Sequence, residues 1–307
     1  MSSGLAPQID VKQLITDTFG TDILTYVANK KRGGDSGRKG TRYEDFFFLY
    51  KAAEIAVKYL AAPKPWPTVR GQVFGFVDDV VVIEPNRTDY YQLKNVKSIT
   101  WTSGDHPLEV DFYNQYTVAQ ALGQPNPMTH LVVSDRTLKG SLEAAVPQNI
   151  RSYSSVIYFP YSEGSLNRLV LESDELQVVL KSLSKHSNPT LDQIEGVFGV
   201  LAMSLWQHPD GGEVDTLLHA ANQRLPNLLR SLEVVDEKQF VIPEFENTLA
   251  GIPGLTYSFD KGFFSWSAFG MSGIFDTDCA SAEFAKFQAD VVQAQPGVFD
   301  DFEGLLP

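Results

Sequence analysis

The segment DDVVVIEPNRTDYYQLKN, residues 78–95, decides the fold prediction for this chain. Residues 80–84 and 90–96 are two apolar runs with the length and the β-branched or aromatic content of strands. The break at residues 85–88 contains Pro and Asn, which favour a turn. Another strand is expected at residues 69–76. The two runs are therefore predicted to be neighbouring strands of one sheet, joined by a short hairpin.

The second of these strands presents different chemistry on its two faces. Side chains alternate across a strand, so Tyr90, Gln92 and Lys94 project one way. Tyr91 and Leu93 project the other way and suit a core beneath a helix. Gln92 and Lys94 are thus predicted to form a polar pair at one edge of the sheet.

An aspartate from the start of the segment is expected at the same edge. Asp79 is the first choice because it adjoins the valine run, and Asp78 is the second. One Asp, the side-chain oxygen of Gln92 and a strand carbonyl can ligate Mg²⁺ or Mn²⁺, which prefer oxygen donors. A lysine beside them, Lys94, can orient or deprotonate a water, or neutralise charge that develops on a phosphate.

A helix before the strands offers one more carboxylate. Residues 43–60 have helical apolar spacing, and Glu44 begins their polar stripe. Because Gln92 is uncharged, a second acidic ligand would strengthen a metal site. Glu44 is the best candidate for it, and Glu84, at the end of the valine strand, is the reserve.

The order of the expected elements indicates the fold class. A helix at residues 108–122 follows the three strands, and short apolar strands follow at residues 130–134 and 155–159. Helix, three strands, helix and strand predict an α/β fold with a mixed sheet flanked by helices. From residue 162 onward the pattern is mostly helical, with strand-like pieces at residues 238–266.

A basic segment lies ahead of the first of these helices. Residues 30–42 combine positive charge with four glycines, which predicts a mobile loop. The loop is expected to contact a nucleic-acid backbone, with a merely solvated loop as the alternative. The glycine and lysine order of a phosphate-binding loop is absent, so an NTPase is not supported. The residues expected to bind nucleic acid are Lys30, Lys31, Arg32, Arg38, Lys39 and Arg42.

Charge is distributed unevenly along the chain. Of 25 Lys and Arg and 38 Asp and Glu, residues 1–150 carry 16 of each, so the net charge of −13 falls entirely on the remainder. Contact with phosphates needs Lys and Arg, so the acidic part is not expected to lie along DNA. It is expected to be a partner-binding or regulatory region, and the alternative is that its charge serves only solubility.

Composition narrows the cellular setting. The 307 residues include one cysteine, Cys279, which excludes an internal disulfide and a zinc site built from cysteines. No apolar run approaches the roughly 18 residues of a bilayer span, and no secretory signal is visible. A cytoplasmic protein without a membrane partner is the expectation.

These residues resemble a known family when taken in order. The series 40–46, Asp78-Asp79 and 91–94 is similar to the PD-(D/E)xK nucleases, in particular to the Gln-x-Lys branch. That branch includes Mrr-like restriction enzymes and the double-stranded DNA nuclease domain of bacterial anti-phage effectors, as in CBASS-associated and Lamassu-type systems. The resemblance covers roughly residues 30–135.

The resemblance implies a restriction-endonuclease-like domain and a metal-dependent endonuclease that cuts invading double-stranded DNA. By position, Asp79 matches the metal-binding aspartate, Gln92 and Lys94 match the motif pair, and Glu44 matches a helix carboxylate that some members use. We expect a nuclease-like domain at residues 1–160 and an acidic, mostly helical partner-binding or regulatory region at residues 161–307. The nuclease activity is expected to be controlled by a partner ATPase or sensor, or by a second copy of the chain.

Two alternatives stay open. Gln92 stands where an acidic residue is commoner, so the site can be degenerate and the chain a non-catalytic subunit that assembles with another defence protein or binds nucleic acid. Without the family pattern, Asp78-Asp79 would be read as a turn, and Gln92 with Lys94 as the solvated face of an edge strand.

Overall fold

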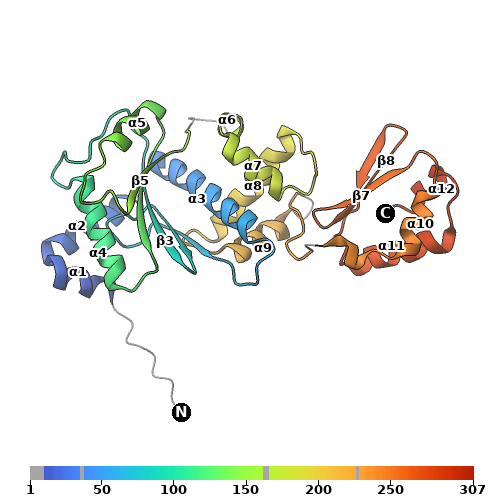
Figure 1. Cartoon of the computed structure of the whole chain (residues 1–307), viewed down its shortest axis with the longest axis horizontal. Coiled ribbons are helices and arrows are strands. Elements are labelled where there is room, and N and C mark those ends of the chain that lie inside the picture. The colour runs from blue at the N-terminus through green and yellow to red at the C-terminus, as the bar shows by residue number, and fades with distance from the viewer. Residues whose placement is uncertain (1–9, 35–37, 162–165, 226–227, 235) are drawn as a thin grey trace, which may run out of the picture.

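A six-stranded mixed sheet forms the centre of the larger part of the molecule (Figure 1). The computed structural model describes residues 10–34, 38–161, 166–225, 228–234 and 236–307. The strand order is β5-β4-β3-β2-β1-β6, in which β1, β2, β3 and β6 have antiparallel neighbours and β4 and β5 continue in parallel from β3. The strands are β1 (Thr68–Gly71), β2 (Val80–Glu84), β3 (Arg87–Lys94), β4 (Pro127–Val133), β5 (Ser154–Tyr158) and β6 (Gly211–Glu213). The predicted α/β class with a mixed sheet is confirmed.

The β2–β3 hairpin is present, and its strands have the expected faces. Val80 pairs with Tyr91 and Val81 with Tyr90. Tyr91 and Leu93 are buried in the hydrophobic core on one face of the sheet, whereas Tyr90 is buried in the core on the other face. Strand alternation alone explains this division.

Helices cover both faces of the sheet. On the face of Tyr91 lie α3 (Arg38–Tyr59), α7 (Asp174–Leu183), α8 (Leu191–Gln207) and α9 (Val214–Arg224), which share one core with it. The face of Tyr90 is covered by α4 (Leu108–Ala121) and α5 (Arg136–Ala144). Two N-terminal helices, α1 (Val11–Phe19) and α2 (Thr21–Gly34), pack around Phe76 and Val118 of α4.

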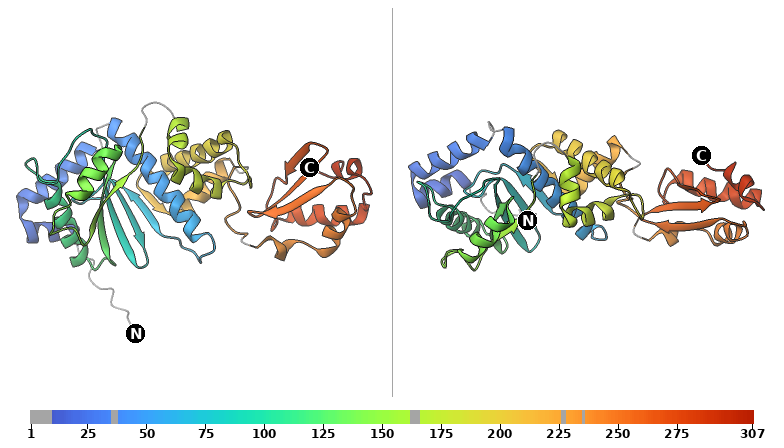
Figure 2. Two further views of the ribbon diagram at one scale, coloured as in Figure 1. Left: turned by 45° about the horizontal axis from the view of Figure 1, so that its top comes forward. Right: turned by 90° about the horizontal axis from the view of Figure 1, so that it is seen from above.

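The C-terminal residues form a second, smaller body at the opposite end of the molecule from α1 and α2 (Figure 2). Its antiparallel sheet, in the order β7-β8-β9, packs one face on helices around a core rich in phenylalanine. The region after residue 160 is mostly helical, as predicted, and this sheet is its main exception. The remaining elements of the region are α6 (Leu166–Glu172), the 3₁₀ helix η1 (Glu237–Phe240), α10 (Pro243–Ala250), β7 (Thr256–Asp260), β8 (Phe263–Ala268), β9 (Met271–Ile274), α11 (Ala282–Ala294) and α12 (Phe299–Glu303).

The packing of the larger body does not stop at residue 160, where a domain boundary is expected from the sequence. β6 adds a strand beside β1, and the helices α7, α8 and α9 bury leucines against α3. The shared core reaches Leu232. The boundary expected at residue 160 therefore does not coincide with a boundary of the hydrophobic core.

The prediction of a loop at residues 30–42 is wrong for the part of this segment that the structure describes. α2 continues through Gly34, and α3 begins at Arg38, so the backbone of the segment is helical on both sides of residues 35–37, which lie outside the described residues. Lys and Arg are good helix formers, and this propensity outweighs the flexibility that the glycines add.

Among the helices of the described residues, none has an apolar stretch long enough to cross a bilayer.

Candidate active site

Asp79 and Gln92 face each other across the start of the β2–β3 hairpin. Val80 pairs with Tyr91, so the residue before Val80 lies opposite the residue after Tyr91. Asp79 Oδ2 accepts a hydrogen bond from the Gln92 side-chain amide and another, of 2.7 Å, from the backbone N–H of Leu93. Asp79 and Gln92 are both buried, at 8% and 2% exposure. The aspartate predicted first from sequence is thus the one that contacts the Gln-x-Lys strand.

Asp78 also points into the interior. It is 2% exposed, and its Oδ1 lies 3.4 Å from Lys30 Nζ without forming a hydrogen bond. Burial raises the pKa of Asp78 to about 6, while the charge of Lys30 opposes the shift. Both members of the acidic doublet thus lie in the site. β1 ends at Gly71, and just after it the backbone N–H of Val73 donates to the carbonyl of Asp78 at 2.8 Å, which holds the doublet beside the end of the strand.

Glu44 approaches the same place from α3. Its Oε2 accepts a 2.7 Å hydrogen bond from the side-chain amide of Gln72, just after β1. Burial, followed by repulsion from Asp79, raises the pKa of Glu44 to about 8, and the positive charge of Lys94 counteracts this. The charge of Lys94, which is half-buried at the end of β3, also opposes the rise in the pKa of Asp78. The tertiary structure thus brings Glu44, Asp78, Asp79 and Lys94 within electrostatic range of each other.

Lys30 is in this cluster, although the sequence predicts it to bind nucleic acid. Its Nζ lies 2.7 Å from Gln92 Oε1 and 3.3 Å from Asp111 Oδ2, in addition to its contact with Asp78, and it donates to the carbonyl of Phe76. The prediction for Lys30 is corrected here, because α2 continues past this residue and places the ammonium among carboxylates. Burial opposes the charge of Lys30, and the neighbouring aspartates outweigh it and raise its pKa.

Of the other five basic residues predicted to bind nucleic acid, the structure describes the side chain of one, Arg42. Arg42 is exposed on α3, where it is free to meet a polyanion. The side chains of the remaining four lie outside the described residues: Lys31, Arg32, Arg38 and Lys39.

The sequence reasoning missed four residues of the site, which are Tyr26, Gln72, Asp111 and Gln115. Asp111 of α4 binds Lys30 and accepts a 2.8 Å hydrogen bond from the Tyr26 hydroxyl of α2. Gln115, one turn later, accepts from the backbone N–H groups of Phe76 and Val77 at 2.9 and 3.2 Å and so holds the segment that leads into Asp78. A helical signal exists for two of them: Asp111 and Gln115 are four apart, so they share one face of α4.

The donor chemistry of the cluster suits a hard divalent cation. Its potential ligands are all oxygens, and Asp78 Oδ1 is a buried acceptor without a hydrogen bond. No three His, Cys, Asp or Glu side chains converge tightly enough to form a metal site by themselves within the described ranges. A bound Mg²⁺ or Mn²⁺ would therefore need an amide or backbone oxygen and several waters beside the carboxylates, an arrangement that Mg²⁺ commonly accepts.

Comparison with known proteins adds nothing to the geometry. The chain matches no protein-family model, and neither a curated protein nor a solved structure is detectably similar to it. The likeness to the PD-(D/E)xK nucleases therefore remains a prediction from residues 40–94.

Proposed function

We propose that the chain is a metal-dependent endonuclease that hydrolyses phosphodiester bonds of double-stranded DNA. The observation that carries this proposal is the contact of Asp79 with Gln92 and Leu93 across the hairpin, with Glu44 and Lys94 in electrostatic range. A bound Mg²⁺ or Mn²⁺ would polarise a phosphoryl oxygen and lower the pKa of a water. Asp79, Gln92 and Asp78 are the proposed ligands.

The protein's own groups have distinct roles in this proposal. The ammonium of Lys94 stabilises the negative charge that grows on the phosphoryl oxygens, and it orients the attacking water. Glu44, whose pKa is raised to about 8, exchanges a proton close to neutral pH and is the candidate to accept one from that water. Arg42 contributes to binding the DNA backbone, together with the basic residues on either side of residues 35–37.

The setting is proposed from the resemblance. Such a nuclease would act in the cytoplasm as an effector of bacterial anti-phage defence. A partner protein, which could be an ATPase or a sensor, or a second copy of the chain would release its activity. The acidic surface after residue 160 is the proposed contact for that control.

One observation favours a second function, a non-catalytic subunit that retains the nuclease fold for assembly or for nucleic-acid binding. Lys30 Nζ contacts Gln92 Oε1 and the carboxylates of Asp78 and Asp111, which are groups that a divalent cation would use. A site whose charge is permanently neutralised by its own lysine would not need a metal.

A plasmid-cutting assay separates the two functions. The full chain is incubated with Mg²⁺ or Mn²⁺, with and without EDTA, alone and with proteins that co-purify from its native operon. Wild type is compared with Lys94→Met and with Lys97→Met, a matched removal of an exposed lysine three residues later. The nuclease predicts metal-dependent scission that falls roughly a hundredfold or more in Lys94→Met only. Absence of scission under every condition, with Lys94→Met behaving as wild type in DNA binding, supports the subunit.

A further inference from the structure

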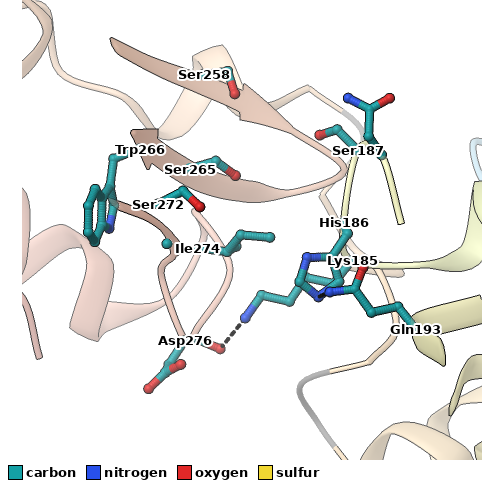
Figure 3. Close-up of a pocket in the computed structure, with 12 residues that line it drawn as sticks. Lys185, His186, Ser187, Gln193, Ser258, Ser265, Trp266, Ser272, Ile274 and Asp276 are labelled. Atoms are coloured by element: carbon teal, nitrogen blue, oxygen red, sulfur yellow. Dashed lines mark hydrogen bonds between the residues drawn. The ribbon is translucent and has the colours of Figure 1, made fainter. Parts of the chain in front are cut away.

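A cavity of about 700 Å³ lies where the loop between α7 and α8 meets the sheet of the smaller body (Figure 3). Its volume falls within the range of small-molecule sites. None of its lining residues belongs to the candidate active site, so it is a separate feature of the molecule. The polar residues that line it include Lys185, His186, Ser187, Asn188, Gln193 and Ser272.

One wall of the cavity is the outer face of the β7-β8-β9 sheet. Phe264 and its neighbours fill the inner face. On the outer face, the strand register places Ser258 of β7, Ser265 of β8 and Ile274 of β9 side by side. This face therefore presents the small hydroxyl groups of Ser258 and Ser265 to the loop, beside the apolar side chain of Ile274.

Lys185, on the opposite wall, is a buried cation whose charge is supported in part by Asp276, which also lines the cavity. It is 5% exposed, and its Nζ makes one long hydrogen bond, 3.5 Å, to the carbonyl of Asp276 (Figure 3). The ammonium also lies 4.5 Å from the ring centre of Phe263. Within the described ranges no carboxylate is within 4.0 Å of it, although an ammonium has three hydrogen atoms to donate.

Further basic groups gather at the same junction. Lys261 Nζ donates to the carbonyls of Lys181 and His186, both at 2.7 Å, and the guanidinium of Arg230 has a buried Nε without a hydrogen bond. Burial lowers the pKa of Lys185, Lys261 and Arg230, because the folded surroundings disfavour their charge. Of these three residues, Lys185 is the one that lines the cavity, so an anion placed against it would reduce this penalty for Lys185, even though this half of the chain is acidic overall.

We infer that this cavity binds a small phosphorylated molecule, with its phosphate against Lys185 and its remaining hydroxyl groups along the serine face of the sheet. A phosphate offers several acceptor oxygens to a lysine point charge and to neighbouring hydroxyls. The inference concerns a site apart from the proposed nuclease, and it stands or falls independently of DNA cleavage.

Calorimetric titration of the full chain tests the inference, with ribose 5-phosphate, inorganic phosphate and ribose as the three probes. Ribose 5-phosphate is expected to bind, inorganic phosphate to bind more weakly and to compete with it, and ribose not to bind. Lys185→Met should weaken ribose 5-phosphate binding roughly tenfold or more. Lys181→Met removes an exposed lysine of α7, four residues before Lys185, and should leave binding unchanged.

A second pair of variants distinguishes a loss of binding from a loss of folding. Ser265→Val adds bulk to the cavity wall on the outer face of the sheet and should also weaken ribose 5-phosphate, whereas Ser267→Val, on the same strand and exposed, should not. Folding is checked by the thermal transition of each variant. The inference is overturned if ribose 5-phosphate does not bind the wild-type chain, or if it binds Lys185→Met and Ser265→Val as tightly as wild type.

Discussion

The candidate active site and the core of the smaller body are both buried, but they are buried in opposite ways. The first packs Asp78, Asp79, Gln92 and Lys30 against one another. The second packs phenylalanine rings, with Phe264 at their centre. Burial of apolar rings stabilises a fold, whereas burial of several charges costs free energy unless each has a partner. The apolar core therefore stabilises the smaller body, whereas the polar cluster of the larger body depends on the pairing of its charges.

The largest effect is expected from opening a hole in the aromatic core. Phe264 is fully buried, so Phe264→Ala should lower the free energy of unfolding by about 3–5 kcal/mol. Amide hydrogen exchange should locate the loss of protection in residues 243–306. Phe269→Ala is the control, because Phe269 is 73% exposed. Equal loss of protection in the β2–β3 hairpin would show that the two bodies unfold as one unit.

Removing the buried ammonium should come next in size. Lys30→Met leaves Asp78 and Asp111 without their counter-charge, which should cost about 3 kcal/mol in the absence of divalent cations. Added Mg²⁺ should restore more stability to this variant than to wild type, as measured by thermal unfolding. Lys97→Met, an exposed lysine, should change stability by less than about 0.5 kcal/mol. A Lys30→Met protein that does not respond to Mg²⁺ would argue against a cation site at these oxygens.

The pH dependence of stability should reveal the raised pKa of Glu44. Its pKa rises from the usual 4.5 to about 8 on folding, so the folded state holds a proton that the unfolded state releases between these values. The contribution of Glu44 is complete below pH 4.5 and is lost as the pH rises towards 8. Urea unfolding from pH 5 to 9 should therefore show a decline that is shallower in Glu44→Gln. Identical slopes for both proteins would contradict the burial of this carboxyl.

The smallest effect is expected from a helix cap in the smaller body. Ser281 Oγ accepts from the N–H of Phe284 at 3.1 Å at the start of α11. Ser281→Ala should therefore lower stability by about 1 kcal/mol in urea unfolding, compared with no measurable change for the exposed Ser267→Ala. A larger loss would mean that α11 depends on more than its cap and its buried phenylalanines.

Local patterns predicted the central part of the fold well. Period-two alternation gave the β2–β3 hairpin and both of its faces, and helical spacing gave α4 within one residue of its observed end. Single residues, rather than the hydrophobic pattern, set two of the helix boundaries. Gly20, at φ 90°, separates α1 from α2. Ser173 caps α7 and separates it from α6.

The candidate site was only partly visible from sequence for a related reason. Asp79, Gln92 and Lys94 are close in the chain, and hairpin geometry relates them directly. Asp111 is more than 15 residues further on, and its place beside Lys30 depends on how α4 packs against α2. No spacing rule relates two helices that meet only through the fold.

The sequence by itself determined the β2–β3 hairpin, its faces and the acidic, amide and amine groups that it carries, because strand periodicity and turn chemistry act over a few residues. Only the tertiary structure decided that Lys30 lies among the carboxylates, that residues 166–232 complete the core of the larger body, and that Lys185 is buried beside a face of serines. Those outcomes depend on contacts between segments far apart in the chain, and long-range packing, rather than local preference, sets which polar groups become buried together.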